Sequence, residues 1–396
     1  MFRKTLFWMH LSSGVVAGLI VLLMSVTGVI LTYERQILAW QDQAYFNEPA
    51  QGQTRLPVEE LIARGSDDNF QPTSIALYND SASPAVLRAG RSGSRHLNAF
   101  TGEVLPPRGE ALDNFFSAVT GWHRWFNVSG DGRGTARDIT GAANLLFLFM
   151  IVSGLYLWLP GIYRRSTMRL RLWFHPNAKT GAARDFNWHH VFGFWFAIPL
   201  IVIVATATVF NYPWANNLVY QLAGEEPPQR GGSATNDQEA ITQQAAPAGT
   251  PLPYQELFDI AGSQVDDYRL LTMTIPDALA TMADFSIDQG NGGEPQKRHS
   301  VTLDAYNGSV VEWAPFNSQS AGRQARSWVR FLHTGEALGI LGQTIAGLAS
   351  LAGVLLTYTG LALCLRRFRN WLRRLRTSPI DNSTTASSSH SSFDTP

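Results

Sequence analysis

Four long stretches of this chain contain no Asp, Glu, Lys or Arg, and they limit its fold more than any other feature. They are residues 5–33, 139–163, 186–224 and 337–365. A helix needs about 20 consecutive apolar residues to cross a bilayer core, and each stretch can supply them. The sequence therefore predicts a membrane α-helical fold. The four transmembrane helices are expected at residues 10–33, 138–160, 188–212 and 337–365.

Basic residues near the ends of these stretches indicate the orientation. Arg3 and Lys4 precede the first stretch, and arginines are frequent in the loop at 161–187 and after residue 365. Lys and Arg accumulate on the cytoplasmic side of a membrane. We expect residues 1–9, 161–187 and 366–396 to be cytoplasmic, both termini included, in the inner membrane of a bacterium. The 31 Lys+Arg balance the 31 Asp+Glu, so the net charge gives no sign of a nucleic-acid partner.

The two long loops, residues 34–137 and 213–336, would then be periplasmic. Each contains a helix start with a proline, at Pro57 and Pro253, followed by short alternating stretches typical of strands. Turns at Gly102 and Gly308 are expected to close a hairpin onto a last strand. The strands are expected at residues 73–78, 85–88, 95–100, 269–275, 283–287 and 300–306. Each loop thus resembles a small α+β domain, and the chain is expected to be a tandem repeat of span, domain, histidine and span.

Two segments have compositions typical of mobile chain. Residues 224–251 are rich in Gly, Pro, Gln and Ala, and the tail after Ser378 is rich in Ser and Thr. We expect the first to be a mobile segment within the second domain. The 366–396 region is expected to be a basic helix followed by a disordered tail.

Four histidines occupy equivalent positions in the two halves. His10 and His189 lie at the cytoplasmic edge, and His123 and His333 lie at the periplasmic edge just before an outgoing span. An ionisable residue at such a place indicates a functional site. A pair at each face is what two bis-histidine haems require as axial iron ligands. The single cysteine, Cys364, rules out a Cys-x-x-Cys-His attachment, so non-covalent haem b is expected.

Glycines and arginines accompany these histidines. A macrocycle lying against a helix needs a neighbouring turn without a side chain. Gly14 and Gly193 follow His10 and His189 by four residues and share their faces. Gly28 is expected near the periplasmic haem, and Gly154 and Gly360 near the cytoplasmic one. Arg124 and Arg330 are suited to pair with propionates at the periplasmic face, and Arg184 or Arg3 at the other.

Other interpretations of the histidines remain open. A single interfacial histidine is commonly a hydrogen-bonded anchor, and a copper or zinc site would use the same residue type. His190 competes with His189, although adjacent residues on a helix point about 100° apart and only His189 keeps the spacing to glycine. His96 and His299 occupy non-equivalent positions in the loops, where surface roles are expected.

Several of these motifs together resemble the PepSY-associated transmembrane family. They are His10-x-x-x-Gly14, Trp122-His-Arg-Trp125, the stretch Ile151–Trp158, the turn Phe100–Val104, and Asn187-Trp-His-His-Val-Phe-Gly193. The resemblance covers residues 1 to 370 and implies PepSY-like periplasmic domains. The whole architecture is similar to inner-membrane di-haem siderophore reductases of the ferrioxamine type.

The resemblance implies a haem-dependent oxidoreductase. Electrons from an unidentified donor, either a quinol or a separate cytoplasmic reductase, would pass through both haems to a ferric siderophore such as ferrioxamine, and ferrous iron would be released in the periplasm. One alternative is a haem electron conduit that serves another periplasmic or quinone partner. The other is a membrane protein without redox chemistry that uses PepSY-like domains for binding or sensing.

Overall fold

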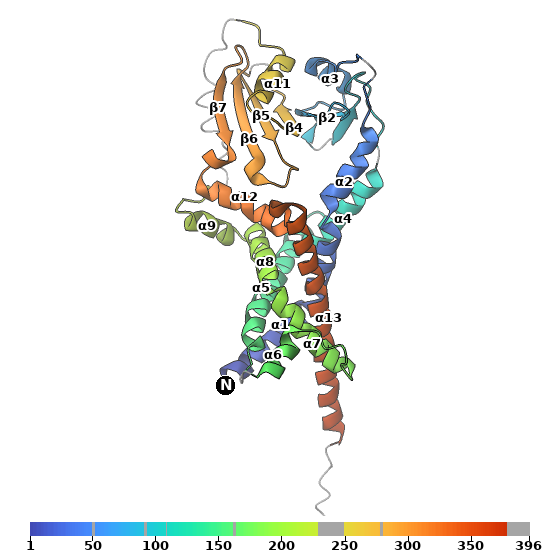
Figure 1. Cartoon of the computed structure of the whole chain (residues 1–396), viewed down its shortest axis with the longest axis vertical. Coiled ribbons are helices and arrows are strands. Elements are labelled where there is room, and N and C mark those ends of the chain that lie inside the picture. Colours follow the sequence, from blue (N-terminus) through green and yellow to red (C-terminus); the bar gives the residue numbers. More distant parts are fainter. Residues whose placement is uncertain are drawn as a thin grey trace, which may run out of the picture.

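The protein has two parts, a bundle of long helices and a β-sheet above one end of the bundle (Figure 1). The structure, a computed structural model, describes residues 1–49, 52–90, 93–107, 109–160, 164–228, 249–277 and 280–377. Most of the segment that the sequence predicts to be mobile, and the tail from residue 378, lie outside these residues.

Within the described residues, three helices are long and apolar enough to cross a membrane, and a bent pair of helices can make a fourth span. The single helices are α1 (Phe2–Leu31), α5 (Gly132–Trp158) and α13 (Gly339–Thr377), and the bent pair is α7 (Gly181–Trp195) and α8 (Ala197–Asn211). The bend between α7 and α8 is 68°.

The expectation of one continuous helix at 188–212 is therefore wrong. The break falls at Phe196, between the two helices. Pro199, three residues later, has no N–H to donate to the carbonyl of Trp195, and its ring clashes with that carbonyl in a continuous helix. The proline thus explains the position of the bend.

Small residues let α1 and α13 approach closely. A Cβ added to Gly353 would lie 2.7 Å from the Ser25 hydroxyl, and one added to Gly347 would lie 2.8 Å from Thr32. In a membrane the hydrophobic effect does not drive helices together, so close backbone approach of this kind supplies the packing energy.

Shorter helices lie around the bundle. The helix α4 (Glu110–Trp125) packs against α1, and α12 (Ala321–Thr334) packs against α8. The remaining short helices are α2 (Glu34–Asp42), α6 (Arg165–Leu172), α9 (Pro213–Leu222), η1 (Gln43–Tyr45), η3 (Pro295–Lys297), η4 (Phe316–Ser318) and η5 (Glu336–Leu338).

Strands from both halves of the chain form one antiparallel sheet in the order β3-β2-β1-β4-β5-β6-β7. The expectation of two separate domains is wrong at this point, because β1 pairs with β4 from Ser74↔Thr274 to Tyr78↔Leu270. Each half alone would leave an edge strand with unpaired backbone groups, and joining the two edges satisfies them. The strands are β1 (Ser74–Tyr78), β2 (Ala85–Arg88), β3 (Ser94–Leu97), β4 (Leu270–Thr274), β5 (Met282–Asp288), β6 (Arg298–Asp304) and β7 (Val310–Pro315).

Two helices cover one face of this sheet. The helices α3 (Val58–Gly65) and α11 (Tyr254–Gly262) begin directly after Pro57 and Pro253, as the sequence predicts. Their apolar sides pack on alternate strand residues, including Ile75, Leu87 and Leu271, which are fully buried. Period-two alternation therefore sends the polar residues of the strands to the opposite face, toward the bundle.

The two halves differ at the predicted closing hairpins. Gly308 has a φ of +71° and leads from β6 into β7. The turn at Gly102 has a φ of +68°, but it is followed only by the isolated bridge between Leu97 and Val104. The expected last strand of the first half is therefore absent from the described residues.

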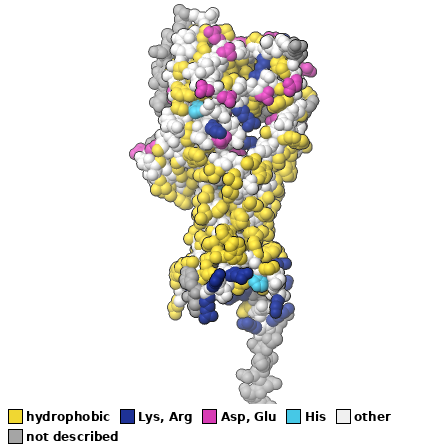
Figure 2. Space-filling view, viewed as in Figure 1, with side chains coloured by type: hydrophobic (Ala, Val, Ile, Leu, Met, Phe, Trp, Pro, Cys, Tyr) yellow, Lys and Arg dark blue, Asp and Glu magenta, His cyan; other side chains and the backbone are white. Residues whose placement is uncertain are grey.

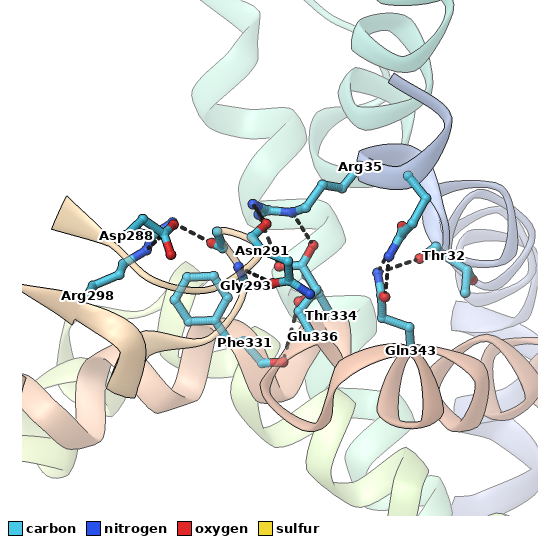
Figure 3. Close-up of polar contacts among 12 residues, drawn as sticks. Thr32, Arg35, Asp288, Asn291, Gly293, Arg298, Phe331, Thr334, Glu336 and Gln343 are labelled. Atoms are coloured by element: carbon cyan, nitrogen blue, oxygen red, sulfur yellow. Dashed lines mark hydrogen bonds and ion pairs between the residues drawn. The ribbon is translucent and has the colours of Figure 1, made fainter. Parts of the chain in front are cut away.

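A polar network links the sheet to the bundle (Figure 3). Arg35, after the end of α1, donates to Glu336 over 2.9 Å and to the Asn291 carbonyl over 3.2 Å. Gln343 on α13 donates to the Thr32 carbonyl over 3.2 Å. The loop after β5 is thus tied to the upper ends of α1 and α13.

Candidate functional site

Each of the four predicted histidines is hydrogen-bonded through Nδ1 to a hydroxyl on a neighbouring helix. The Nδ1-to-hydroxyl distances are 2.9 Å from His10 to Ser153, 2.8 Å from His123 to Thr27, 3.0 Å from His189 to Thr359, and 3.2 Å from His333 to Thr206. In each case the histidine and the hydroxyl come from different helices.

The proton of each hydroxyl has a backbone carbonyl of its own helix as acceptor. Ser153, Thr27, Thr359 and Thr206 all donate to the carbonyl four residues earlier in their own helix, over 2.7 Å. When that proton is donated to the carbonyl, the hydroxyl accepts in the Nδ1 contact and the imidazole donates. His333 Nδ1 also lies 2.9 Å from the Ile203 carbonyl, which can only accept. In this arrangement a neutral ring carries its proton on Nδ1 and keeps the Nε2 lone pair for a ligand.

His123 on α4 and His333 on α12 face one another at the end of the bundle nearest the sheet. Their ring centroids are 6.4 Å apart. Two imidazoles on opposite sides of one metal atom, each bonded at about 2 Å, hold their ring centres roughly 6 Å apart. Burial lowers the pKa of His123 to about 4, and the neighbouring His333 contributes to this shift. Burial also lowers the pKa of His333. Both rings are thus kept in the neutral form that binds metals.

His10 on α1 and His189 on α7 lie at the other end of the bundle. His10 contacts Ser153 and His189 contacts Thr359, so both rings are held by a hydroxyl of a neighbouring helix. His190 points elsewhere, because its Nδ1 donates over 2.8 Å to the Phe186 carbonyl of its own helix. These contacts favour His189 over His190 as the partner of His10.

Glycines stand next to three of the four rings. A Cβ added to Gly154 would lie 3.2 Å from His10 Cε1, one at Gly360 3.3 Å from His189 Cε1, and one at Gly28 3.6 Å from His123 Cε1. Each of these glycines follows the hydroxyl residue that holds the ring. In the fourth case Ala207 follows Thr206.

The hydroxyl residues were missed in reading the sequence, although the pairs Thr27-Gly28, Ser153-Gly154 and Thr359-Gly360 repeat visibly within the apolar stretches. A Cβ added to Gly14 would meet Met150, and one added to Gly193 would meet Leu356, so their predicted role beside a macrocycle stays a prediction. Helical spacing alone did not show which neighbouring helix each glycine faces.

The two arginines that the sequence suggests for a propionate at the His10 and His189 end already have protein partners. Arg3 donates to the carbonyls of Leu157 and Leu159, at 2.8 and 2.5 Å. Arg184 donates to the fully buried Asp185, over 2.9 Å. Nearby, the buried nitrogens Trp158 Nε1 and Arg171 Nη1 have no hydrogen-bond partner among the described residues. Buried polar atoms of this kind are those that a bound group would satisfy.

A cavity of about 1430 Å³ lies between the bundle and the sheet, and His123 and His333 line it. Arg124 and Arg330, the predicted propionate partners at this end, line it as well. Neither has a carboxylate within ion-pair distance among the described residues. They are therefore free to bind an anionic group.

The two remaining histidines of the sheet region lie apart from both pairs. His96 stacks on Tyr45 with 4.2 Å between ring centroids, and His299 stacks on Trp313 at 5.5 Å. Within the described part of the chain, no group of three or more His, Cys, Asp or Glu side chains is arranged around a point that could hold a bare metal ion.

Together these features define a helical membrane protein with an extramembrane antiparallel sheet and an imidazole pair at each end of its bundle. Residues 7–367 match the family model described as PepSY-associated TM region, and the chain belongs to this family. No curated protein matched the chain.

Proposed function

We propose that this protein holds two b-type haems and moves electrons across the bacterial inner membrane to reduce a ferric siderophore in the periplasm. The observation that carries the proposal is that all four imidazoles contact a hydroxyl of a neighbouring helix through Nδ1, an arrangement in which Nδ1 donates and Nε2 is available. Axial haem ligation uses this form of histidine.

The residues present fit such a group at both ends. His123 with His333, and His10 with His189, would supply the axial nitrogens. Gly28, Gly154 and Gly360 leave space beside three of the rings. Buried and unpartnered, Trp158 Nε1 is a donor at the cytoplasmic end. Bound haem would supply one-electron transfer.

The distribution of side chains supports the proposed orientation. Figure 2 shows an apolar band around the bundle, with Lys and Arg below it and most of the visible Asp and Glu on the sheet region above it. By the positive-inside rule the lower end is cytoplasmic. Both termini would then be cytoplasmic and the sheet would be periplasmic.

The cavity gives an acceptor access to the periplasmic pair. A ferric siderophore would take one electron there, and its oxygen-rich chelator holds Fe(II) far less tightly than Fe(III), so ferrous iron would be released. The described cytoplasmic segments are short, so the electron donor would be a quinol in the membrane or a separate reductase.

A haem count tests this proposal. Protein purified in detergent should show two haems b per chain by the pyridine haemochrome assay, and His10→Ala and His333→Ala should each lose one. His299→Ala is the matched control and should keep both. A colourless parent protein from cells with ample haem would contradict the proposal and favour a binding or sensing role.

A further inference from the structure

The cavity is closed on one side by the polar face of the joined sheet. Tyr78 and Arg88 come from the first half of the chain, and Thr272, Ser286 and Asp288 come from the second. The charges of Arg88 and Arg269 both act on Tyr78, so the two arginines share one patch although they come from different halves. Joining the two half-sheets therefore creates a single wall that neither half has alone.

Positive charge dominates this cavity. Eight arginines and four carboxylates line it. Arg35 and Arg298 pair with Glu336 and Asp288, over 2.9 and 3.7 Å. Arg88 and Arg269 have no such partner among the described residues and are exposed to the cavity. Two propionates facing Arg124 and Arg330 would cancel two of the excess charges and leave the cavity positive.

Building on the proposed function, we propose that this cavity binds the iron complex and selects an anionic one, whose iron is held by carboxylates or catecholates. Arginine forks bind carboxylates in two-point contacts. A cavity lined by one sign of charge also concentrates ligands of the opposite sign. A trishydroxamate with a free ammonium group, such as ferrioxamine B, is cationic and is disfavoured here.

The redox step is balanced without bond formation. One electron leaves the reduced protein, the iron of the complex goes from Fe(III) to Fe(II), and the quinol or reductase donor replaces the electron. Selectivity is therefore a property of binding and is measurable without electron transfer.

Redox-inert gallium(III) complexes isolate this binding step. In calorimetric titrations of the whole protein at low salt, gallium citrate should bind with an affinity at least about 10-fold higher than gallium desferrioxamine B. The affinity for gallium citrate should fall as the salt concentration rises. The double variant Arg88→Gln/Arg269→Gln should lower the gallium citrate affinity by about 10-fold. Arg323→Gln removes an exposed charge from α12 outside the cavity and should have no effect.

Three results would overturn the inference: equal or tighter binding of the cationic complex, equal binding of inorganic phosphate, or an unchanged affinity in the double variant. The haem count is measured on the same samples and shows that the variants fold. Because gallium binding needs neither haem reduction nor an electron donor, a failure of charge selection is distinct from a failure of the proposed electron transfer.

Discussion

The two ends of the bundle hold their histidines by the same kind of hydrogen bond, but only one end borders the large cavity. At both ends a hydroxyl on a neighbouring helix holds the imidazole Nδ1, and a small residue follows that hydroxyl. At one end His10 and His189 lie on α1 and α7, helices of the spanning bundle itself. At the other end the histidines lie on the separate helices α4 and α12 and border the large cavity.

This difference shows that ligand geometry and exposure are built by separate parts of the fold. The spanning helices supply hydroxyl and glycine pairs at both ends. Only the sheet, tied to the bundle by Arg35 and Glu336, converts one end into a cavity (Figure 3). An enclosed pair suits an internal relay, and an accessible pair suits exchange with a ligand.

Filling the space beside one ring should give the largest effect. Gly154→Leu places a side chain against His10, where a Cβ alone would lie 3.2 Å from the ring. We expect loss of the haem proposed between His10 and His189 and retention of the one proposed between His123 and His333, measured by haemochrome count. Gly134→Leu on the same helix is the control, since nothing lies within 4 Å of its added Cβ. Retention of both haems in Gly154→Leu would place the cofactor elsewhere.

Removing a hydroxyl should weaken haem binding at one end of the bundle without filling the space for the haem. Thr359→Val deletes the acceptor for His189 Nδ1 at nearly constant shape, and Thr27→Val does the same for His123. Loss of such a supporting hydrogen bond lowers metal affinity by about 10–100-fold. Haem titration of each variant should show weakening at one end only. Thr357→Val, whose hydroxyl donates to Gly353, is the control, and equal weakening there would refute the supporting role.

Breaking the tie between sheet and bundle should affect the open end alone. Glu336→Gln removes the charge that pairs with Arg35, whose side chain is 35% exposed. Exposed pairs are worth up to about 1 kcal/mol, so we expect a loss of that order in local stability. Hydrogen exchange should quicken in the loop at Asn291, with α7 as an internal control. Faster exchange in α7 as well would indicate general destabilisation.

Acidification should have the smallest effect on the sheet region. Burial lowers the pKa of His96 below its ordinary 6.5. The unfolded chain therefore binds a proton more readily, so the stability gained from the neutral ring is complete above pH 6.5 and declines as the pH falls below it. Hydrogen exchange of β2 and β3 should quicken modestly between pH 7 and 5. His96→Gln should flatten this dependence, and an unchanged slope would assign it to another group.

Features that depend on neighbours along the chain were predictable from the sequence. Charge-free stretches located the membrane helices, Pro57 and Pro253 located two helix starts, and two-residue alternation located the strands, because each of these is a property of local composition and period. The pairing of His123 with His333 was also predictable, since equivalent positions in the two halves fall at the same membrane face.

Contacts between distant segments were decided by the tertiary structure. The pairing of β1 with β4 joins strands almost two hundred residues apart, and two unpaired strand edges in one chain carry no local signal of whether they will meet. The contact between Thr27 and His123 was likewise not predictable. In the sequence, a hydroxyl inside an apolar helix is only a tolerated polar residue, and the structure shows that a ring from another helix contacts it. The arginine-lined cavity exists only once the joined sheet stands over the bundle, since its walls are drawn from both halves of the chain.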